Sequence, residues 1–268
     1  MSNQDLIEQY EADGAVCVRG VVPQDMVAEV LAHITELIES DEDRWTTIRN
    51  GGFCDRRLWP TMPWMYAFCA KSPLPGLVGQ LMRSNEARLY FDHIFVRDAG
   101  TRQTTPWHQD RPYWPFQGKQ VASAWVALTA CDKESSSLRF IRGSHKAGKV
   151  YRPIKFSNAG EANEFLGDVE EFELMPDYDA NLDDYELLCW DVEPGDAIVF
   201  GAEVVHGAAE NNNLDERRAA LSVRYLGDDV RWDPRPGTDP MVNEEMVSIK
   251  PGDPPHDEQC FPRVWRAA

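Results

Sequence analysis

Residues 87–98, ARLYFDHIFVRD, decide the fold class, because the chain changes here from helical to extended character. Apolar and aromatic side chains dominate the stretch, and polar residues bound it. Four later stretches share this character, each bounded by Gly, Asp, Pro or Ser: QVASAWVALTA (120–130), SLRFIRGS (137–144), GDAIVFGAEVVHG (195–207) and RRAALSVRYLG (217–227). Such a succession of short strands favours an antiparallel sandwich or barrel. We therefore expect a mainly β protein.

The part of the chain before these strands has helical periodicity. Apolar residues recur at helical spacing before Gly14, and a second apolar stripe follows Pro23, which suits a first helical turn. The stretch between them, AVCVRGVV, is typical of a strand. We expect helices over 5–14, 23–41, about 65–69 and 77–83, a strand over 15–22, and loop in the rest of 44–75.

We expect one domain with three parts. Residues 1–85 form an N-terminal helical support, 86–232 form the strand-rich core, and 233–268 form a tail that wraps the surface or covers a cleft. The core contains an acidic, turn-rich insertion at about 149–190, which we place over the sheet rather than in it. The 18 prolines argue against long helices.

Size and charge exclude several classes of function. A chain of 268 residues can bury a full core without disulfide or metal support. Its 45 acidic and 27 basic residues give a net charge of −18, which disfavours nucleic acid and anionic membrane surfaces as partners. No stretch is long and apolar enough for a membrane helix, and the start does not resemble a signal peptide. The six cysteines have no CxxC spacing. We expect reduced thiols and a cytoplasmic location.

The run TPWHQDRPYW (105–114) contains the first candidate metal ligands, His108 and Asp110. On an extended chain, residues two apart point to the same face, so an imidazole nitrogen and a carboxylate oxygen could share one metal ion. An HxD motif is common by chance, so a third ligand is needed to give it meaning.

His206 is the candidate third ligand, because it ends the apolar stretch GDAIVFGAEVVH and alternation places it on one face with Val204. Two histidines and one carboxylate form the facial triad, which leaves three positions open and is typical of non-heme Fe(II) oxygenases. Catalytic zinc uses similar donors, so the donors alone do not name the metal.

The stretch RRAALSVRY (217–225) supplies a guanidinium and a hydroxyl for a carboxylate. Arg218, Ala220, Ser222 and Arg224 alternate with Leu221, Val223 and Tyr225, and the second set is typical of packing surface. A guanidinium suits bidentate binding of a dicarboxylate's distal carboxylate. Either Arg217 or Arg218 could instead pair with acidic surface residues.

Four stretches together resemble the phytanoyl-CoA dioxygenase family: TPWHQD (105–110), SAWVALTACDKESSSLRFIRGSHK (123–146), GDAIVFGAEVVHGA (195–208) and RRAALSVRYLGDD (217–229). Members of this family are Fe(II)- and 2-oxoglutarate-dependent oxygenases on a double-stranded β-helix. The resemblance implies a jelly-roll, cupin-like core supported by the N-terminal helices. It also implies Fe(II), 2-oxoglutarate as co-substrate and dioxygen.

The resemblance assigns roles to individual residues. His108, Asp110 and His206 become the catalytic iron ligands. Arg218 becomes the 2-oxoglutarate anchor, because the family's Arg precedes a small-residue strand with Ser four positions on, here Ser222; Arg217 is the alternative. Trp125 takes the place of a tryptophan that lies against the co-substrate, although it could be a core residue. Arg56 or Arg57 could supply a further basic residue.

The resemblance also implies the reaction, which oxidises a C–H bond and releases succinate and CO2. The acid at Asp110 disfavours halogenation, because halogenating relatives have Gly or Ala there. Trp107, Tyr113, Trp114 and His93 are candidate substrate residues, although rings at these positions could equally pack the rim of the core. The net charge weighs against an acyl-CoA and favours a small metabolite or natural-product intermediate.

Two alternatives from other classes remain. A cupin-like isomerase or hydrolase would use the metal without 2-oxoglutarate and would give Arg218 no role. A non-catalytic jelly-roll binding protein would tolerate replacement of His108, Asp110 or His206.

Overall fold

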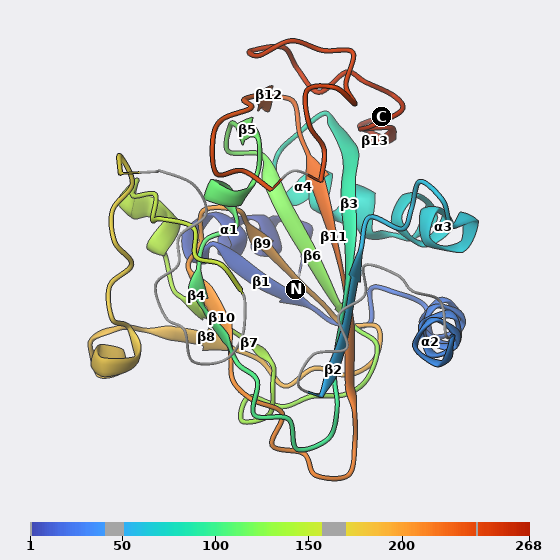
Figure 1. Cartoon of the computed structure of the whole chain (residues 1–268), viewed down its shortest axis with the longest axis vertical. Coiled ribbons are helices and arrows are strands. Elements are labelled where there is room, and N and C mark those ends of the chain that lie inside the picture. Colours follow the sequence, from blue (N-terminus) through green and yellow to red (C-terminus); the bar gives the residue numbers. More distant parts are fainter. Residues whose placement is uncertain (1, 41–50, 157–169, 240) are drawn as a thin grey trace.

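The computed structural model describes residues 2–40, 51–156, 170–239 and 241–268, and it consists of two packed β-sheets with helices on one side (Figure 1). The larger sheet has the strand order β1-β9-β6-β11-β3-β13, and β2 also pairs with β3. Its strands are β1 (Ala15–Val18), β2 (Gly52–Arg56), β3 (Glu86–Arg97), β6 (Val121–Ala127), β9 (Ala197–Gly201), β11 (Arg218–Leu226) and β13 (Arg263–Arg266).

The smaller sheet has the order β4-β10-β7-β8, and a two-stranded sheet pairs β12 with β5. All these pairings are antiparallel. The strands are β4 (Thr105–His108), β5 (Phe116–Gln117), β7 (Leu138–Ile141), β8 (Leu187–Cys189), β10 (His206–Ala208) and β12 (Arg231–Trp232). The expected mainly β jelly-roll fold with flanking helices is confirmed.

Helices cover the outer face of the larger sheet. The expected helices are present as α1 (Asn3–Asp13), α2 (Gln24–Glu39), α3 (Pro63–Lys71) and α4 (Leu74–Leu81), and three 3-10 helices follow at Arg111–Tyr113, Ser144–Ala147 and Asp179–Asp184. The side chains of Val30 and Ile34 on α2 share one buried cluster with Leu221 and Val223 of β11. Tyr225 belongs to the same cluster, and its hydroxyl donates to Cys69 O at 2.7 Å. The apolar half of the alternation in β11 therefore packs against the helices.

The other half of the alternation faces the interior between the sheets. The antiparallel register places Ser222 beside His93 of β3 and Trp125 of β6, and Arg224 beside Phe91 and Ser123. These inward side chains cover the face of the larger sheet that packs against the smaller sheet.

The structure corrects four details of the sequence-based prediction. Residues 195–207 are not one strand: β9 ends at Gly201, a turn follows, and β10 begins at His206 in the other sheet. Part of the expected loop forms β2, the end of the expected insertion forms β8, and the tail forms β13. Each of these three short strands lies at an edge and forms by pairing with a strand distant in sequence, which local patterning does not reveal.

The remaining global expectations concern membranes and thiols. Among the described residues, no helix is long and apolar enough to cross a bilayer. All six cysteines are free thiols, as their spacing predicted.

Candidate metal centre

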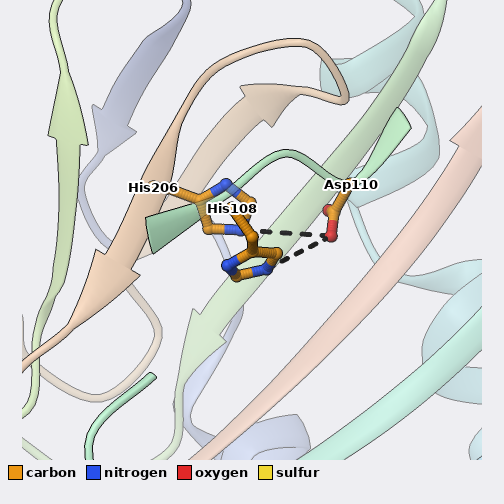
Figure 2. Close-up of side chains that lie close together, drawn as sticks. All are labelled: His108, Asp110 and His206. Atoms are coloured by element: carbon orange, nitrogen blue, oxygen red, sulfur yellow. Dashed lines mark ion pairs between the residues drawn. The ribbon is translucent and has the colours of Figure 1, made fainter. Parts of the chain in front are cut away.

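Side chains from two segments that are far apart in sequence, one with His108 and Asp110 and the other with His206, meet between the two sheets (Figure 2). His108 is the last residue of β4, and His206 is the first residue of β10 and lies directly opposite it in the antiparallel pair. Asp110 follows β4 in a helical conformation (φ −72°, ψ −34°), so the HxD segment is not extended as expected. The chain turns after His108, and this turn aims the carboxylate back at the imidazoles.

The three side chains are arranged as a donor set. Asp110 Oδ1 lies 3.7 Å from His108 Nε2 and 4.0 Å from His206 Nε2. One ligand atom from each of the three residues falls within 4.8 Å of the other two, and all three residues are buried. Among the described residues, this is the one group of three or more such side chains close enough to hold an ion.

Backbone carbonyls fix the tautomer of both imidazoles. His108 Nδ1–H donates to Pro106 O at 2.9 Å, and His206 Nδ1–H donates to Val204 O at 3.1 Å. A carbonyl can only accept, so the free lone pair of each ring is on Nε2, which faces Asp110. Burial lowers the pKa of His108 to about 3, and it also lowers the pKa of His206. Both rings are therefore neutral near pH 7, as metal ligation requires.

Ser123 of β6 holds the carboxylate from the opposite sheet. Its hydroxyl donates to Asp110 Oδ2 at 3.1 Å, which leaves Oδ1 facing the imidazoles. Two neutral nitrogens and one oriented carboxylate oxygen fit a divalent metal ion such as Fe(II) and leave coordination positions open. The sequence analysis missed Ser123, because only the packing of β6 on the HxD turn brings the two residues together.

Arg218 and Arg217 have opposite surroundings. Arg218 is buried, with its guanidinium carbon 5.7 Å from the centroid of the Trp125 ring, whereas Arg217 is half exposed and pairs with Asp98 at 2.8 Å. Ser222 is cross-strand from Trp125, and its buried hydroxyl has no hydrogen-bond partner among the described residues. The structure thus brings Arg218, Trp125 and Ser222 together on the inner face.

A second buried guanidinium, Arg97 of β3, lies opposite Arg218 in the sheet. Arg218 Nε donates to Ser136 Oγ at 2.9 Å and Arg97 Nη1 donates to the same oxygen at 3.4 Å, but neither forms an ion pair with a described carboxylate. Burial lowers the pKa of Arg218 to about 10. Burial also lowers the pKa of Arg97, and together with the nearby charge of Arg218 it brings that pKa to about 9. Two adjacent buried cations without an acid form a site for an anion.

Three of the candidate substrate residues face the same interior. Tyr113 lies 6.1 Å from His108 between ring centroids, and its hydroxyl donates to Ile154 O. Trp114 packs edge-on against Phe91 at 5.9 Å. His93 is half-buried beside Phe95, with its Nε2 2.9 Å from Cys54 Sγ.

Trp107 is not brought together with the metal centre. It precedes His108 on β4, so alternation turns its side chain to the opposite face of the smaller sheet. There it packs on Tyr178 and donates to Asp179 Oδ1 at 2.9 Å. Arg56 and Arg57 likewise contact the tail: Arg56 pairs with Asp239, and Arg57 donates to Met241 O.

A jelly roll that buries two histidines and one carboxylate between its sheets defines a class, the cupin-like metalloproteins to which non-heme iron oxygenases belong. Within that class, the family model described as phytanoyl-CoA dioxygenase (PhyH) matches residues 10–219 of this chain. The chain belongs to the phytanoyl-CoA dioxygenase family.

Comparisons with individual proteins agree with this assignment. The chain is 25% identical over 196 residues to a probable phytanoyl-CoA dioxygenase of Caenorhabditis elegans, which covers 70% of this chain and 59% of the relative. It is 25% identical to the human peroxisomal phytanoyl-CoA dioxygenase over 57% of this chain and 43% of that protein. The chain thus spans about half the length of these relatives.

Solved structures share the whole fold. The non-heme alpha ketoglutarate dependent carbocyclase SnoK from nogalamycin biosynthesis superposes with a TM-score of 0.75 at 22% identity, over 99% of this chain and 97% of SnoK. EctD from S. alaskensis, solved with 2-oxoglutarate and 5-hydroxyectoine, gives 0.70 at 15% identity, over 95% and 86%. The epimerase SnoN, in complex with Fe3+, alpha ketoglutarate and nogalamycin RO, gives 0.71 at 22% identity, over 98% of both chains.

Proposed function

We propose that this protein is an Fe(II)- and 2-oxoglutarate-dependent oxygenase that oxidises a C–H bond of a small organic molecule and releases succinate and CO2. One observation carries the proposal: the neutral imidazoles of His108 and His206 converge with Asp110 inside the same barrel that buries an unpaired guanidinium at Arg218. A metal site alone would not require that second feature.

In this proposal His108, Asp110 and His206 are the catalytic metal ligands. Bound iron would supply the activation of dioxygen at the expense of 2-oxoglutarate. The chain's own residues orient the metal ligands and exclude water. The Nδ1–H groups of His108 and His206 and the hydroxyl of Ser123 hold the three ligands in place through hydrogen bonds. Burial of the ligands between the sheets keeps bulk water from the reacting atoms.

Arg218 is proposed to bind the distal carboxylate of 2-oxoglutarate, with the Trp125 ring as one wall and the free Ser222 hydroxyl as a further donor. Arg97 adds a second positive charge at this end of the barrel. Tyr113, Trp114 and His93, whose rings contact His108, Phe91 and Phe95 respectively, are the proposed substrate contacts.

The partner in this proposal is a small molecule rather than nucleic acid or membrane. The net charge of −18 supports this view, and so do the relatives. SnoN was solved with nogalamycin RO and EctD with 5-hydroxyectoine, and both are small molecules.

The test is anaerobic binding of Fe(II) and 2-oxoglutarate, followed by the weak metal-to-ligand charge-transfer absorption that the two produce together. We expect the band in the wild type and its loss in Asp110→Ala. Arg218→Gln should weaken 2-oxoglutarate binding by roughly ten- to a hundredfold, because a buried charge-assisted hydrogen bond is removed. Arg217→Gln is the matched control and should bind normally.

An unchanged band in Asp110→Ala would refute the ligand assignment. Metal binding without any effect of 2-oxoglutarate or of Arg218→Gln would instead favour the cupin-like isomerase or hydrolase.

A further inference from the structure

Arg224 is a buried cation next to the metal centre to which the proposed function gives no role. It lies on β11 six residues after Arg218 and on the same inward face of the strand. Its cross-strand neighbour on β6 is Ser123, the serine that binds Asp110. Arg224 therefore lies level with Ser123 and with the Asp110 carboxylate that this serine binds.

The guanidinium of Arg224 lacks a counter-ion. Its side chain is inside the protein, with the residue 5% exposed, and no described carboxylate is within ion-pair distance. Nη1 donates to the carbonyl of Ser222 at 3.1 Å, and the buried Nε has no hydrogen-bond partner among the described residues. Asp110 and Asp92 act on it only through longer-range attraction.

Aromatic rings surround this cation but do not satisfy it. The guanidinium carbon lies 4.6 Å from the centroid of Phe91, 5.8 Å from Phe95 and 5.9 Å from Trp114. Ring faces attract a cation but accept no strong hydrogen bond from Nε, and their attraction is much weaker than the cost of burying an unpaired charge. A buried, rigidly walled and unpaired guanidinium is the arrangement that binds a planar oxyanion.

We infer that Arg224 binds an oxyanion of the organic substrate, most simply a carboxylate, and so orients the substrate over the metal. This inference rests on the proposed function, because it assigns the open side of that same metal centre to the substrate. The rings of Phe91 and Trp114 then contact the carbon skeleton next to the acid. The substrate class is a small organic acid with an apolar or aromatic body.

The experiment compares two probes of the same shape, 3-phenylpropanoate and the neutral 3-phenylpropanamide. Their binding is measured by NMR line broadening of the ring protons, first with the metal-free chain and then with the chain loaded with Mn(II) and 2-oxoglutarate. The wild type should bind the acid about tenfold or more tightly than the amide, because only the acid forms charge-assisted hydrogen bonds. In Arg224→Gln this ratio should fall to about one, while Mn(II) and 2-oxoglutarate bind as in the wild type.

Two further variants complete the design. Arg217→Gln removes an exposed guanidinium just before β11 and should keep the wild-type preference for the acid over the amide. Arg224→Met keeps the bulk of the side chain, should lose the preference, and should unfold at a higher urea concentration than the wild type because it removes an unpaired buried charge.

Four results would overturn the inference: no preference for the acid in the wild type, a preference that survives in Arg224→Gln, loss of 2-oxoglutarate binding in that variant, or loss of Mn(II) binding in both Arg224 variants. Loss of 2-oxoglutarate binding in Arg224→Gln would mean that Arg224 binds the co-substrate. Loss of Mn(II) binding in both Arg224 variants would mean that Arg224 is needed for the structure of the site. Failure of the proposed function looks different: the wild type would then bind no Mn(II) with 2-oxoglutarate, yet the metal-free chain would still prefer the acid through Arg224.

Discussion

At the scale of single residues, Ser123 is the contact through which the larger sheet orients the carboxylate of Asp110, the proposed metal ligand. We predict that Ser123→Ala weakens Fe(II) or Mn(II) affinity by roughly tenfold, because groups that orient a ligand usually contribute this much. Metal titration followed by tryptophan fluorescence or calorimetry measures the effect.

The control for this prediction is Ser137→Ala, a buried serine that donates to Trp190 O at 2.7 Å and has no contact with the triad. It should bind metal normally. Equal metal affinity in the two variants would mean that Asp110 keeps its orientation without Ser123.

The sequence was sufficient to predict site residues that belong to a motif or to an alternating strand pattern. The structure buries four of these residues, His108, Asp110, His206 and Arg218, between the two sheets. It was insufficient for residues whose role depends on a contact between strands. Ser123 and Ser136 are ordinary strand and turn serines in the sequence, and only packing places them against Asp110 and Arg218. Arg224 did appear in the inward alternation, but its missing counter-ion is visible only in three dimensions.

At the scale of elements, α4 lies against the C-terminal strand through a glycine. A Cβ at Gly79 would lie 2.3 Å from the Trp265 ring of β13, so the helix can approach this strand only without a side chain there. We predict that Gly79→Ala destabilises the protein by about 1–3 kcal/mol, although alanine favours helices, because the ring must move. Urea unfolding and protease sensitivity of the last residues measure this.

Gly76 on the same helix is the matched position, since its Cβ would come no closer than 3.3 Å to the same tryptophan. Gly76→Ala should change the free energy of unfolding much less than Gly79→Ala. Equal effects of the two substitutions would show that the helix, and not its packing on β13, decides the outcome.

The strands show why edge elements escaped prediction. The long central strands β3, β6 and β11 have continuous apolar or alternating patterns and were located closely. The turn between β9 and β10, AEVV, is as apolar as a strand and fully or partly buried, so the hydrophobic pattern continues through a change of sheet. Hydrophobicity reports burial, and a buried turn cannot be distinguished from a strand on that basis.

At the scale of the whole molecule, Asp92 links the pH of the solution to folding. Its buried carboxylate accepts from Leu58 N and Trp59 N and so fastens the segment after β2 to β3. Burial raises its pKa from 3.8 to about 6. The folded state therefore binds this proton more tightly than the unfolded state, and the resulting stabilisation is complete below about pH 4 and is lost as the pH rises through 6.

We predict that Asp92→Asn lowers the free energy of unfolding, because an amide cannot accept from both backbone groups. The wild type loses the stabilisation from the Asp92 proton between pH 4 and pH 7, and the variant has no such stabilisation to lose. The decrease in unfolding free energy caused by the substitution should therefore be smaller at pH 7 than at pH 4 by roughly 2 kcal/mol. Urea unfolding at both pH values tests this. A loss that grows with pH would mean that the native carboxylate is ionised throughout.

The neighbouring cations Arg97 and Arg218 have a consequence for the lifetime of the folded chain. A dicarboxylate that neutralises these two cations binds the folded chain and not the unfolded chain. Each tenfold rise in 2-oxoglutarate above its dissociation constant should therefore raise the free energy of unfolding by about 1.4 kcal/mol. The melting temperature should rise with 2-oxoglutarate in the wild type and hardly at all in Arg218→Gln. Under the proposed function, the steady-state amount of the folded protein in a cell would then follow the concentration of 2-oxoglutarate, because the ligand-free chain unfolds more often and is degraded.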